Sequence, residues 1–221
     1  MEVREYISIR RAYNLVRRET PAKERLAFEE LAVLAHLLAS EKPLRTSEIA
    51  SYQNVLRPTM THRTSHLEKL GLILRETGAQ DRRSVCCSIT DKGASVLFAN
   101  AEALCEKIPN GRSPYRVTND RILKYIDAMG AVYLTASELI LLRLGDAKDG
   151  LNVSALSNDL GMLQPTVSMS VAGLEEQKLL VRKPTERKSS SLMQLTAAGK
   201  KQAADIATSI AGLVVRRSRR G

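Results

Sequence analysis

The chain has 221 residues, of which 43% are hydrophobic and 26% charged, and it carries a net charge of +10 with a pI of about 9.7. This balance indicates a folded protein of one or two domains and excludes an intrinsically disordered one. The sequence has no apolar run that could span a bilayer and no N-terminal signal segment, so we expect a cytoplasmic, nucleoid-associated protein. The basic charge predicts a polyanionic partner, with nucleic acid ahead of an anionic membrane surface.

Hydrophobic spacing predicts four helices in the first third of the chain. They cover residues 2–19, a stretch from Pro21 to just before Pro43, a short segment that opens at Thr46, and residues 57–71. Pro58 suits the first turn of the fourth helix, and Gly71 suits the position just past its end. Met60, Leu67 and Leu70 share one face of this helix, which leaves hydroxyl, guanidinium and imidazole side chains on the other.

After residue 71 the pattern changes to that of a β-hairpin. Residues 72–75 and 84–89 read as strands around a polar loop that carries Arg82 and Arg83 near its tip. Another helix starts at Thr90. Residues 109–114 contain two prolines and a glycine, which favours a linker at this point.

The same order then recurs. A helix is expected over residues 115–132. A capping box at Thr135 and Glu138 begins a second helix, and Asn152 caps a short third helix. A further helix opens at Gln164, two strands cover residues 179–182 and 192–195 around a basic loop, and a last helix follows Thr196. At a constant offset of 107 residues, Pro58, Leu67, Glu68 and Arg75 meet Pro165, Leu174, Glu175 and Arg182.

Two short helices followed by a hairpin form a winged helix-turn-helix, whose second short helix enters a major groove while the hairpin reaches the flanking backbone. The residues that carry a family resemblance are Ser47-Glu48-Ile49-Ala50, Arg57-Pro58-Thr59-Met60-Thr61, Leu67-Glu68-Lys69-Leu70-Gly71-Leu72-Ile73, and Asp81-Arg82-Arg83-Ser84 leading to Ile89-Thr90-Asp91-Lys92-Gly93. With these motifs the chain resembles the MarR family of bacterial transcription regulators, and its doubled unit is similar to the two-repeat Sar-type regulators of staphylococci.

The resemblance implies a mostly α-helical fold with small β-hairpin wings. It also implies two units, residues 1–110 and residues 111–221 with their basic C-terminal tail, which form an intramolecular pseudo-dimer through their terminal helices. The implied function is sequence-specific binding of double-stranded DNA to regulate transcription. A small-molecule effector is compatible with the family, and the protein would be a monomeric pseudo-dimer or a homodimer.

The first unit is expected to supply most of the base readout and the second unit wing contacts to phosphates. DNA contacts of the first unit are assigned to Arg57, Thr59, Thr61, His62, Arg63, Ser65, His66, Arg82 and Arg83. Those of the second unit are assigned to Gln164, Thr166, Ser168, Ser170, Arg187 and Lys188. The second helix carries Met169, Ser170 and Gly173 where the first carries His62, Arg63 and His66. Arg63→Ala would therefore relax specificity at one base position.

Other functions fit the sequence less well. Cys86 and Cys87 suggest a sensor of oxidants. Adjacent strand residues face opposite ways, however, so one of the two thiols should be buried and inert. The spacing of His62 and His66 suggests a metal site. No further ligand stands beside them in the sequence, so we expect no metal and no cofactor. No nucleophile elbow or phosphate-cradling glycine loop indicates an enzyme. A plasmid-type replication initiator and a tandem winged-helix protein-interaction module remain alternatives.

Overall fold

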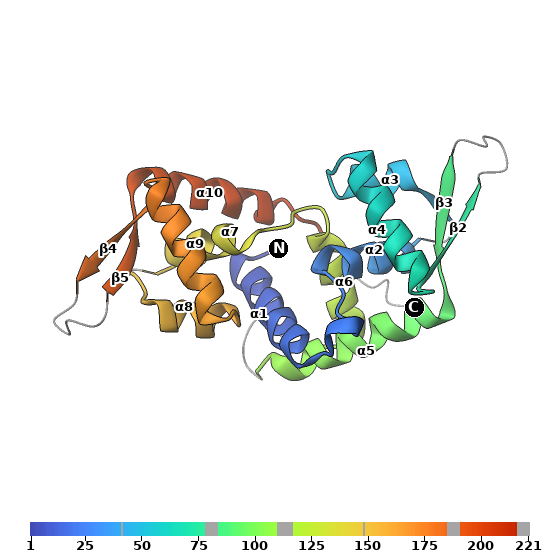
Figure 1. The fold of residues 1–221 in the computed structure, drawn as a ribbon, viewed down its shortest axis with the longest axis horizontal. Helices are drawn as coiled ribbons and strands as arrows, with labels where there is room; N and C mark the ends of the chain where they lie inside the picture. Colours follow the sequence, from blue (N-terminus) through green and yellow to red (C-terminus); the bar gives the residue numbers. More distant parts are fainter. Residues whose placement is uncertain (41, 78–83, 110–116, 148, 185–190, 216–221) are drawn as a thin grey trace. The chain divides into compact units, whose positions relative to one another are not determined.

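The computed structural model describes every residue except 41, 78–83, 110–116, 148, 185–190 and 216–221 (Figure 1). The described residues are mainly helical and include two small antiparallel sheets. The chain divides into two compact units. One joins Thr20–Pro109 to Arg116–Tyr133, and the other joins Met1–Glu19 to Leu134–Gly212. We call them the α4 unit and the α9 unit, after the helix that occupies the same place in each.

The α4 unit has the element order of a winged helix. Its helices and strands are α2 (Phe28–Leu38), β1 (Leu44–Arg45), α3 (Thr46–Tyr52), α4 (Arg57–Lys69), β2 (Ile73–Thr77), β3 (Val85–Ile89), α5 (Asp91–Lys107) and α6 (Asn119–Met129). The strands pair in the order β1-β3-β2, with Leu44 opposite Cys87 and Ile73 opposite Ile89. The hairpin of β2 and β3 is the wing of this unit, and it extends beyond the helices beside it (Figure 1).

The helix expected from Pro21 begins seven residues later, at Phe28, and that expectation was wrong. Ala22–Glu24 form only a single 3-10 turn. Ala27 has an extended backbone and donates its N–H to the Glu30 carboxylate at 2.8 Å, which satisfies one of the free donors at the start of α2. The local cap therefore sets the first residue of this helix, although a proline was available upstream.

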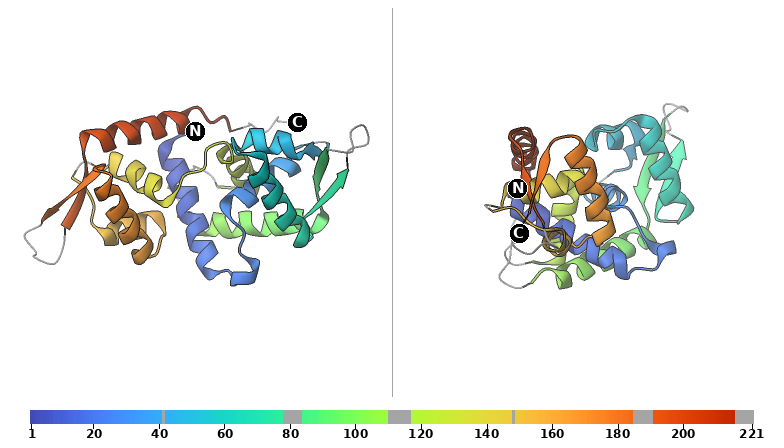
Figure 2. Two further views of the ribbon diagram at one scale, coloured as in Figure 1. Left: turned by 45° about the horizontal axis from the view of Figure 1, so that its top comes forward. Right: turned by 60° about the vertical axis from the view of Figure 1, so that its left-hand side comes forward.

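The α9 unit repeats this order. It contains α1 (Val3–Glu19), α7 (Ala136–Gly145), α8 (Val153–Leu160), α9 (Gln164–Glu176), β4 (Leu180–Pro184), β5 (Ser191–Leu195) and α10 (Ala197–Ala211). The expected capping box is confirmed, since Thr135 N–H donates to Glu138 at 2.8 Å and Asn152 accepts from Ala155 N–H at 2.8 Å. Two further views show α10, in red, beside α7, in yellow (Figure 2).

Each unit takes one helix from the other half of the sequence. In the α9 unit, α1 contacts α7, α8 and α10, and Asn14 of α1 donates to the Leu160 carbonyl at 2.8 Å. In the α4 unit, α6 contacts α2 and α5, and Asp127 of α6 accepts from His36 at 2.8 Å. The compact units therefore differ from the predicted domains. In that prediction α1 belonged to residues 1–110 and α6 to residues 111–221.

The junction between wing and last helix is built in the same way in both units. Thr90 and Thr196 cap α5 and α10 by accepting from Gly93 N–H at 3.0 Å and Gly199 N–H at 3.1 Å. Each threonine hydroxyl also donates to the carbonyl of the residue that ends the preceding turn, Gly71 or Lys178. Both of those residues have a positive φ. The expected repeat is thus present in the hydrogen bonds as well as in the sequence.

Apolar side chains from the helices of each unit fill its centre, and a few large ones, such as Phe98 of α5 and Met169 of α9, stay exposed. Within the described part of the chain, no helix is long and apolar enough to cross a membrane.

Candidate nucleic-acid interface

Three buried side chains fix which side of α4 faces outward. Met60, Thr64 and Leu67 are completely buried against the body of the unit. The hydroxyl of Thr64 donates to the Met60 carbonyl at 2.9 Å, so its burial leaves no polar group unsatisfied. The opposite side of the helix is presented to solvent. Its exposed or half-buried polar residues are Arg57, Thr59, Thr61, His62, Ser65, Glu68 and Lys69.

Arg63, which was expected to read a base, lies on the flank of α4 that meets α2. Its guanidinium donates to Glu29 Oε1 at 3.0 Å and to Gln53 Oε1 at 2.7 Å. The side chains of Arg63 and Glu29 are only 19% and 16% exposed. The helix period therefore places Arg63 about a quarter turn away from the outward line through His62.

His66 is the next residue on the same flank, one helical turn after Arg63. Its Nδ1 lies 2.5 Å from Glu30 Oε1, and its side chain is 45% exposed. Glu29 and Glu30, in the first turn of α2, thus hold two side chains of α4. Of the predicted DNA contacts on this helix, the structure brings Arg57, Thr61, His62 and Ser65 together and turns Arg63 and His66 toward α2.

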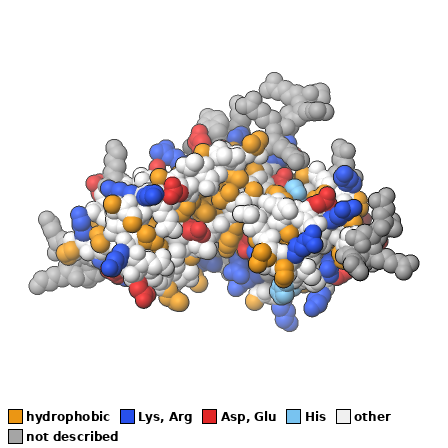
Figure 3. Space-filling model, turned by 90° about the horizontal axis from the view of Figure 1, so that it is seen from above, with side chains coloured by type: hydrophobic (Ala, Val, Ile, Leu, Met, Phe, Trp, Pro, Cys, Tyr) orange, Lys and Arg blue, Asp and Glu red, His pale blue; other side chains and the backbone are white. Residues whose placement is uncertain are grey.

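A hollow of about 430 Å³ lies beside the outward side of α4, between that helix, the start of α3 and the wing. Arg45, Arg57 and Arg75 contribute to its lining, which gives it a positive potential suited to an anion. The rest of the lining consists of Val85 and four hydroxyl residues: Thr46, Ser47, Thr61 and Ser84. On the face drawn in Figure 3, blue Lys and Arg side chains lie beside the lower of the two pale blue histidines.

Arg75 connects the wing to α4. Its Nη1 donates to Ser65 Oγ at 2.8 Å and to Glu68 Oε2 at 3.1 Å, and only 15% of the side chain is exposed. The equivalent pair in the other unit is Arg182 with Glu175, at 2.9 Å. In both units this arginine fixes the base of the wing relative to the outward helix.

The outward side of α9 differs in its chemistry. Val167, Val171 and Leu174 are buried, and Gln164, Thr166 and Ser168 are exposed, whereas Ser170 is half-buried. Met169 is 77% exposed. At the offset of 107 residues, Asn152 and Gln164 replace Arg45 and Arg57, so the counterpart of the hollow loses two of its cations.

The predicted wing-tip contacts Arg82, Arg83, Arg187 and Lys188 lie outside the described residues. The structure does describe the strands that lead to both tips, including exposed Arg182 and Lys183 on β4. Sequence reasoning missed Lys69, Arg45 and Arg75. Lys69 follows His62 by seven residues, so helical spacing alone would have placed both on one line. The hollow lined by Arg45 and Arg75 required the tertiary structure.

The cysteines are arranged as the strand period predicts. Cys87 is completely buried and Cys86 is half-buried. Burial raises the pKa of the Cys87 thiol, although Thr46 and Arg75 act in the opposite direction. Burial also raises the pKa of Cys105, together with the charge of Glu102. Among the described residues no group of three His, Cys, Asp or Glu side chains could hold a metal ion.

In a Cys86→Ala/Cys105→Ala variant, we expect Cys87 to react with an aromatic disulfide reagent only as fast as the α4 unit opens. The thiolate is the reactive form, and burial both excludes the reagent and shifts thiolate formation to higher pH. The rate should therefore rise with pH and with low concentrations of denaturant. Rapid labelling of the folded variant at neutral pH would contradict this expectation, and a Cys87→Ala/Cys105→Ala variant gives the rate for half-buried Cys86.

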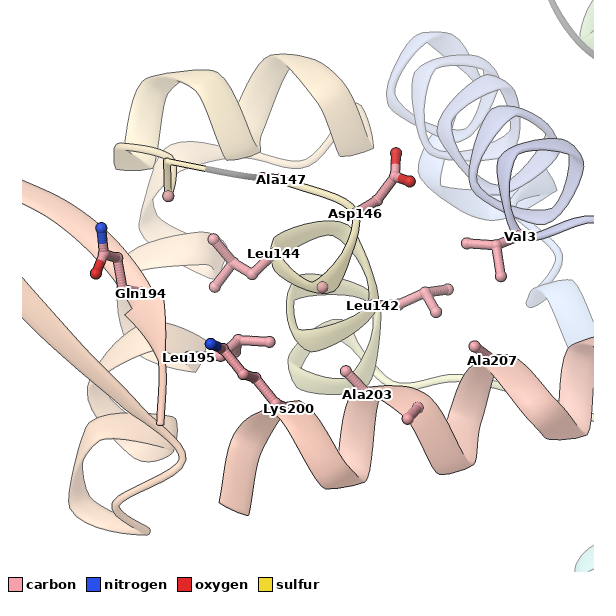
Figure 4. A pocket seen from close by; sticks show the side chains of 13 residues that line it. Val3, Leu142, Leu144, Asp146, Ala147, Gln194, Leu195, Lys200, Ala203 and Ala207 are labelled. Carbon is pink, nitrogen blue, oxygen red and sulfur yellow. The ribbon is translucent and has the colours of Figure 1, made fainter. Parts of the chain in front are cut away.

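A second hollow, of about 550 Å³, lies in the α9 unit between α7 and α10 (Figure 4). Apolar and polar surface contribute about equally to its lining, with Leu142, Leu144 and Leu195 among the apolar side chains and Val3 of α1 on one side. Asp146, Gln194 and Lys200 supply polar groups around it.

Comparison with known families assigns the region that carries α4. The model of the MarR family matches residues 29–85, a stretch that begins in α2 and ends in β3. The matched stretch therefore covers α3, α4 and β2 together with most of α2 and the first residue of β3.

Comparison with curated proteins gave no match. Among solved structures, the YusO protein from Bacillus subtilis is 30% identical over 41% of this chain and 62% of its own, with a TM-score of 0.37. The transcriptional regulator BldR from Sulfolobus solfataricus is 28% identical over 42% of this chain and 64% of its own, with a TM-score of 0.36. The chain thus spans less than two thirds of the length of either protein.

Proposed function

We propose that the protein is a sequence-specific regulator of transcription that binds double-stranded DNA through two winged helices. The observation that carries the proposal is the outward side of α4. There Thr61 lines a hollow to which three arginines contribute, and His62 and Lys69 are exposed on the same helix. This helix lies inside the stretch that matches the MarR family model. A helix with short polar side chains suits the edges of bases in a major groove, and the arginines suit the phosphates beside it.

Within this proposal the α4 unit supplies most of the base readout. Its base-reading residues are Thr61, His62, Ser65 and Lys69, with Arg57 and Arg45 directed to the backbone. Arg63 and His66 hold α4 on α2 instead of entering the groove. Thr59 and the wing arginines Arg82 and Arg83 contact flanking phosphates.

The α9 unit contributes Gln164, Thr166, Ser168 and Ser170 from its helix, and Arg187 and Lys188 from its wing. Because Asn152 and Gln164 stand where the α4 unit has arginines, this unit should bind its half-site with fewer phosphate contacts. The preferred DNA site would then be asymmetric. In a tandem chain of this kind the two units act as an intramolecular pseudo-dimer, which spans half-sites about one helical turn apart.

Two further elements complete the proposal. The cell compartment would be the cytoplasm, at the nucleoid, where the DNA is found. The hollow between α7 and α10 would accept a small effector that carries polar as well as apolar groups, with Lys200 and Asp146 as its polar contacts. No enzymatic activity, metal or cofactor forms part of the function.

The experiment that tests the proposed function is the selection of bound sequences from a random pool of double-stranded DNA, followed by footprinting. A regulator should enrich one asymmetric site and protect two neighbouring major grooves. Equal protection of two identical half-sites would refute the division of labour. A replication initiator would enrich a site found at an origin rather than upstream of a gene. A protein-interaction module would enrich nothing, and its affinity for random DNA would not fall steeply with salt.

Arg57→Ala should weaken binding to all DNA sequences alike and reduce the slope of log affinity against log salt by about 1, because one phosphate contact is lost. The matched variant is Gln164→Ala, at the equivalent position of α9, which should leave the slope unchanged. Fluorescence anisotropy over a range of salt concentrations measures both. An unchanged slope in Arg57→Ala, or a changed base preference, would show that Arg57 does not act on a phosphate.

A further inference from the structure

The centre of the outward side of α9 is apolar, and the side chains there are small except for one. Pro165, Met169 and Ala172 lie opposite the buried side of the helix, and all three are exposed. Gly173 has no side chain, and its position faces open space, because a Cβ built on it would meet nothing within 4 Å. A surface that approaches this helix can therefore come close to its backbone, with the Met169 side chain as the first contact.

The equivalent line on α4 is polar. At the offset of 107 residues, His62, Ser65 and Lys69 of α4 become Met169, Ala172 and Glu176 of α9. The hydrogen-bond donors and the cation that recognise guanine in a major groove are thus absent from the α9 line. Glu175, on the edge of the helix, is paired with Arg182 at 2.9 Å, which reduces its repulsion of a nearby phosphate. Glu176 is exposed at the C-terminal end of the outward line, so the apolar part of that line is its first two turns, around Met169.

The apolar group that a major groove presents is the C5 methyl group of thymine. Methionine is long, unbranched and polarizable, so it adapts to such a group without a fixed geometry. We infer that α9 recognises thymine methyl groups in its half-site, with Met169 as the principal contact and Ala172 beside it. This inference rests on the proposed function and specifies what the second unit reads: thymine through its methyl group.

The two units then discriminate bases by different physical means. The α4 unit forms hydrogen bonds to base edges, whereas the α9 unit excludes water from methyl groups. Recognition of methyl groups by α9 requires close contact but few basic side chains. This fits the uncharged residues Asn152 and Gln164, which replace two arginines of the α4 unit. It also gives the α9 half-site a preference for thymine that depends little on salt.

The test replaces thymines of the selected DNA site, one at a time, by deoxyuridine. This change keeps the base pair and its hydrogen bonds and removes only the methyl group. Each methyl group that α9 contacts should contribute about fourfold to affinity, the value expected for burying one such group. Met169→Ala should abolish the sensitivity to deoxyuridine at one or two positions. Because Met169 is 77% exposed, this variant should melt at the same temperature as the wild type.

His62→Ala is the matched control, since it alters the same place on α4. It should weaken binding but leave the response to deoxyuridine in the α9 half-site intact. A second arm replaces a sensitive T·A pair by C·G and then by 5-methylcytosine·G, and the methylated pair should bind more tightly than the unmethylated one.

The inference is overturned if deoxyuridine has no effect anywhere in the bound site, or if Met169→Ala keeps the full effect. Either result, with DNA binding intact, would leave α9 facing something other than thymine, such as a protein surface. Failure of the proposed function looks different, because the wild-type protein would then enrich no DNA sequence from the random pool.

Discussion

Arg63→Ala is expected to destabilise the α4 unit by about 2 kcal/mol and to leave the preferred bases of the DNA site unchanged. Removing the guanidinium leaves the Glu29 carboxylate and the Gln53 amide without the partner that they share. Breaking a buried ion pair on one side costs about 3–5 kcal/mol, and the remaining exposure of both side chains reduces that figure here. Denaturant unfolding followed by circular dichroism measures the change in the free energy of unfolding.

The affinity of Arg63→Ala for DNA should fall by the same factor for every sequence, since α4 loses its support and no base contact is removed. Thr61→Ala is the matched control on the outward side of the same helix, and it should alter base preference without a measurable change in stability. A Glu29→Gln/Arg63→Met double variant should recover part of the lost stability, because neither remaining side chain is charged. If Arg63→Ala relaxed preference at one base position at unchanged stability, the guanidinium would be a base contact after all.

The direction of the Arg63 side chain could not be predicted from the sequence. The sequence placed a basic residue on a helix with polar neighbours, and an arginine there is a common base contact. Its real direction depends on Glu29, which is 34 residues away and lies in another helix. Such a pair leaves no local signal, since the same residue pattern is compatible with an arginine turned to solvent.

Features set by neighbouring residues were predicted well. The threonine caps before α5, α7 and α10 and the wing strands depend on a few adjacent residues, and all of them are present in the structure. The exchange of α1 and α6 between the two halves was not predicted. A helix with one apolar side can bury that side against either winged helix, and periodicity does not distinguish the two partners. Strand β1 was also missed, because two residues carry no alternation.

Gly93→Ala should destabilise the α4 unit by about 3 kcal/mol, the upper end of the cost of inserting one carbon into a tight contact. A Cβ on Gly93 would lie 2.0 Å from the Leu72 carbonyl oxygen, far inside the contact distance. That carbonyl cannot easily move, because it accepts from Thr90 N–H at 3.1 Å and thereby joins the turn after α4 to the cap of α5.

Gly199→Ala is the equivalent change in the α9 unit, where the Cβ would lie 1.9 Å from the Leu179 carbonyl oxygen. Each variant should lower the stability of its own unit, so calorimetry should show one shifted transition in either protein. Gly173→Ala, in open space on α9, is the control and should stabilise the protein slightly, by about 0.5–1 kcal/mol, as expected for alanine in a helix. If Gly93→Ala shifted both transitions equally, the two units would unfold as one. That outcome would mean that the two units are coupled more strongly than the division into compact units implies.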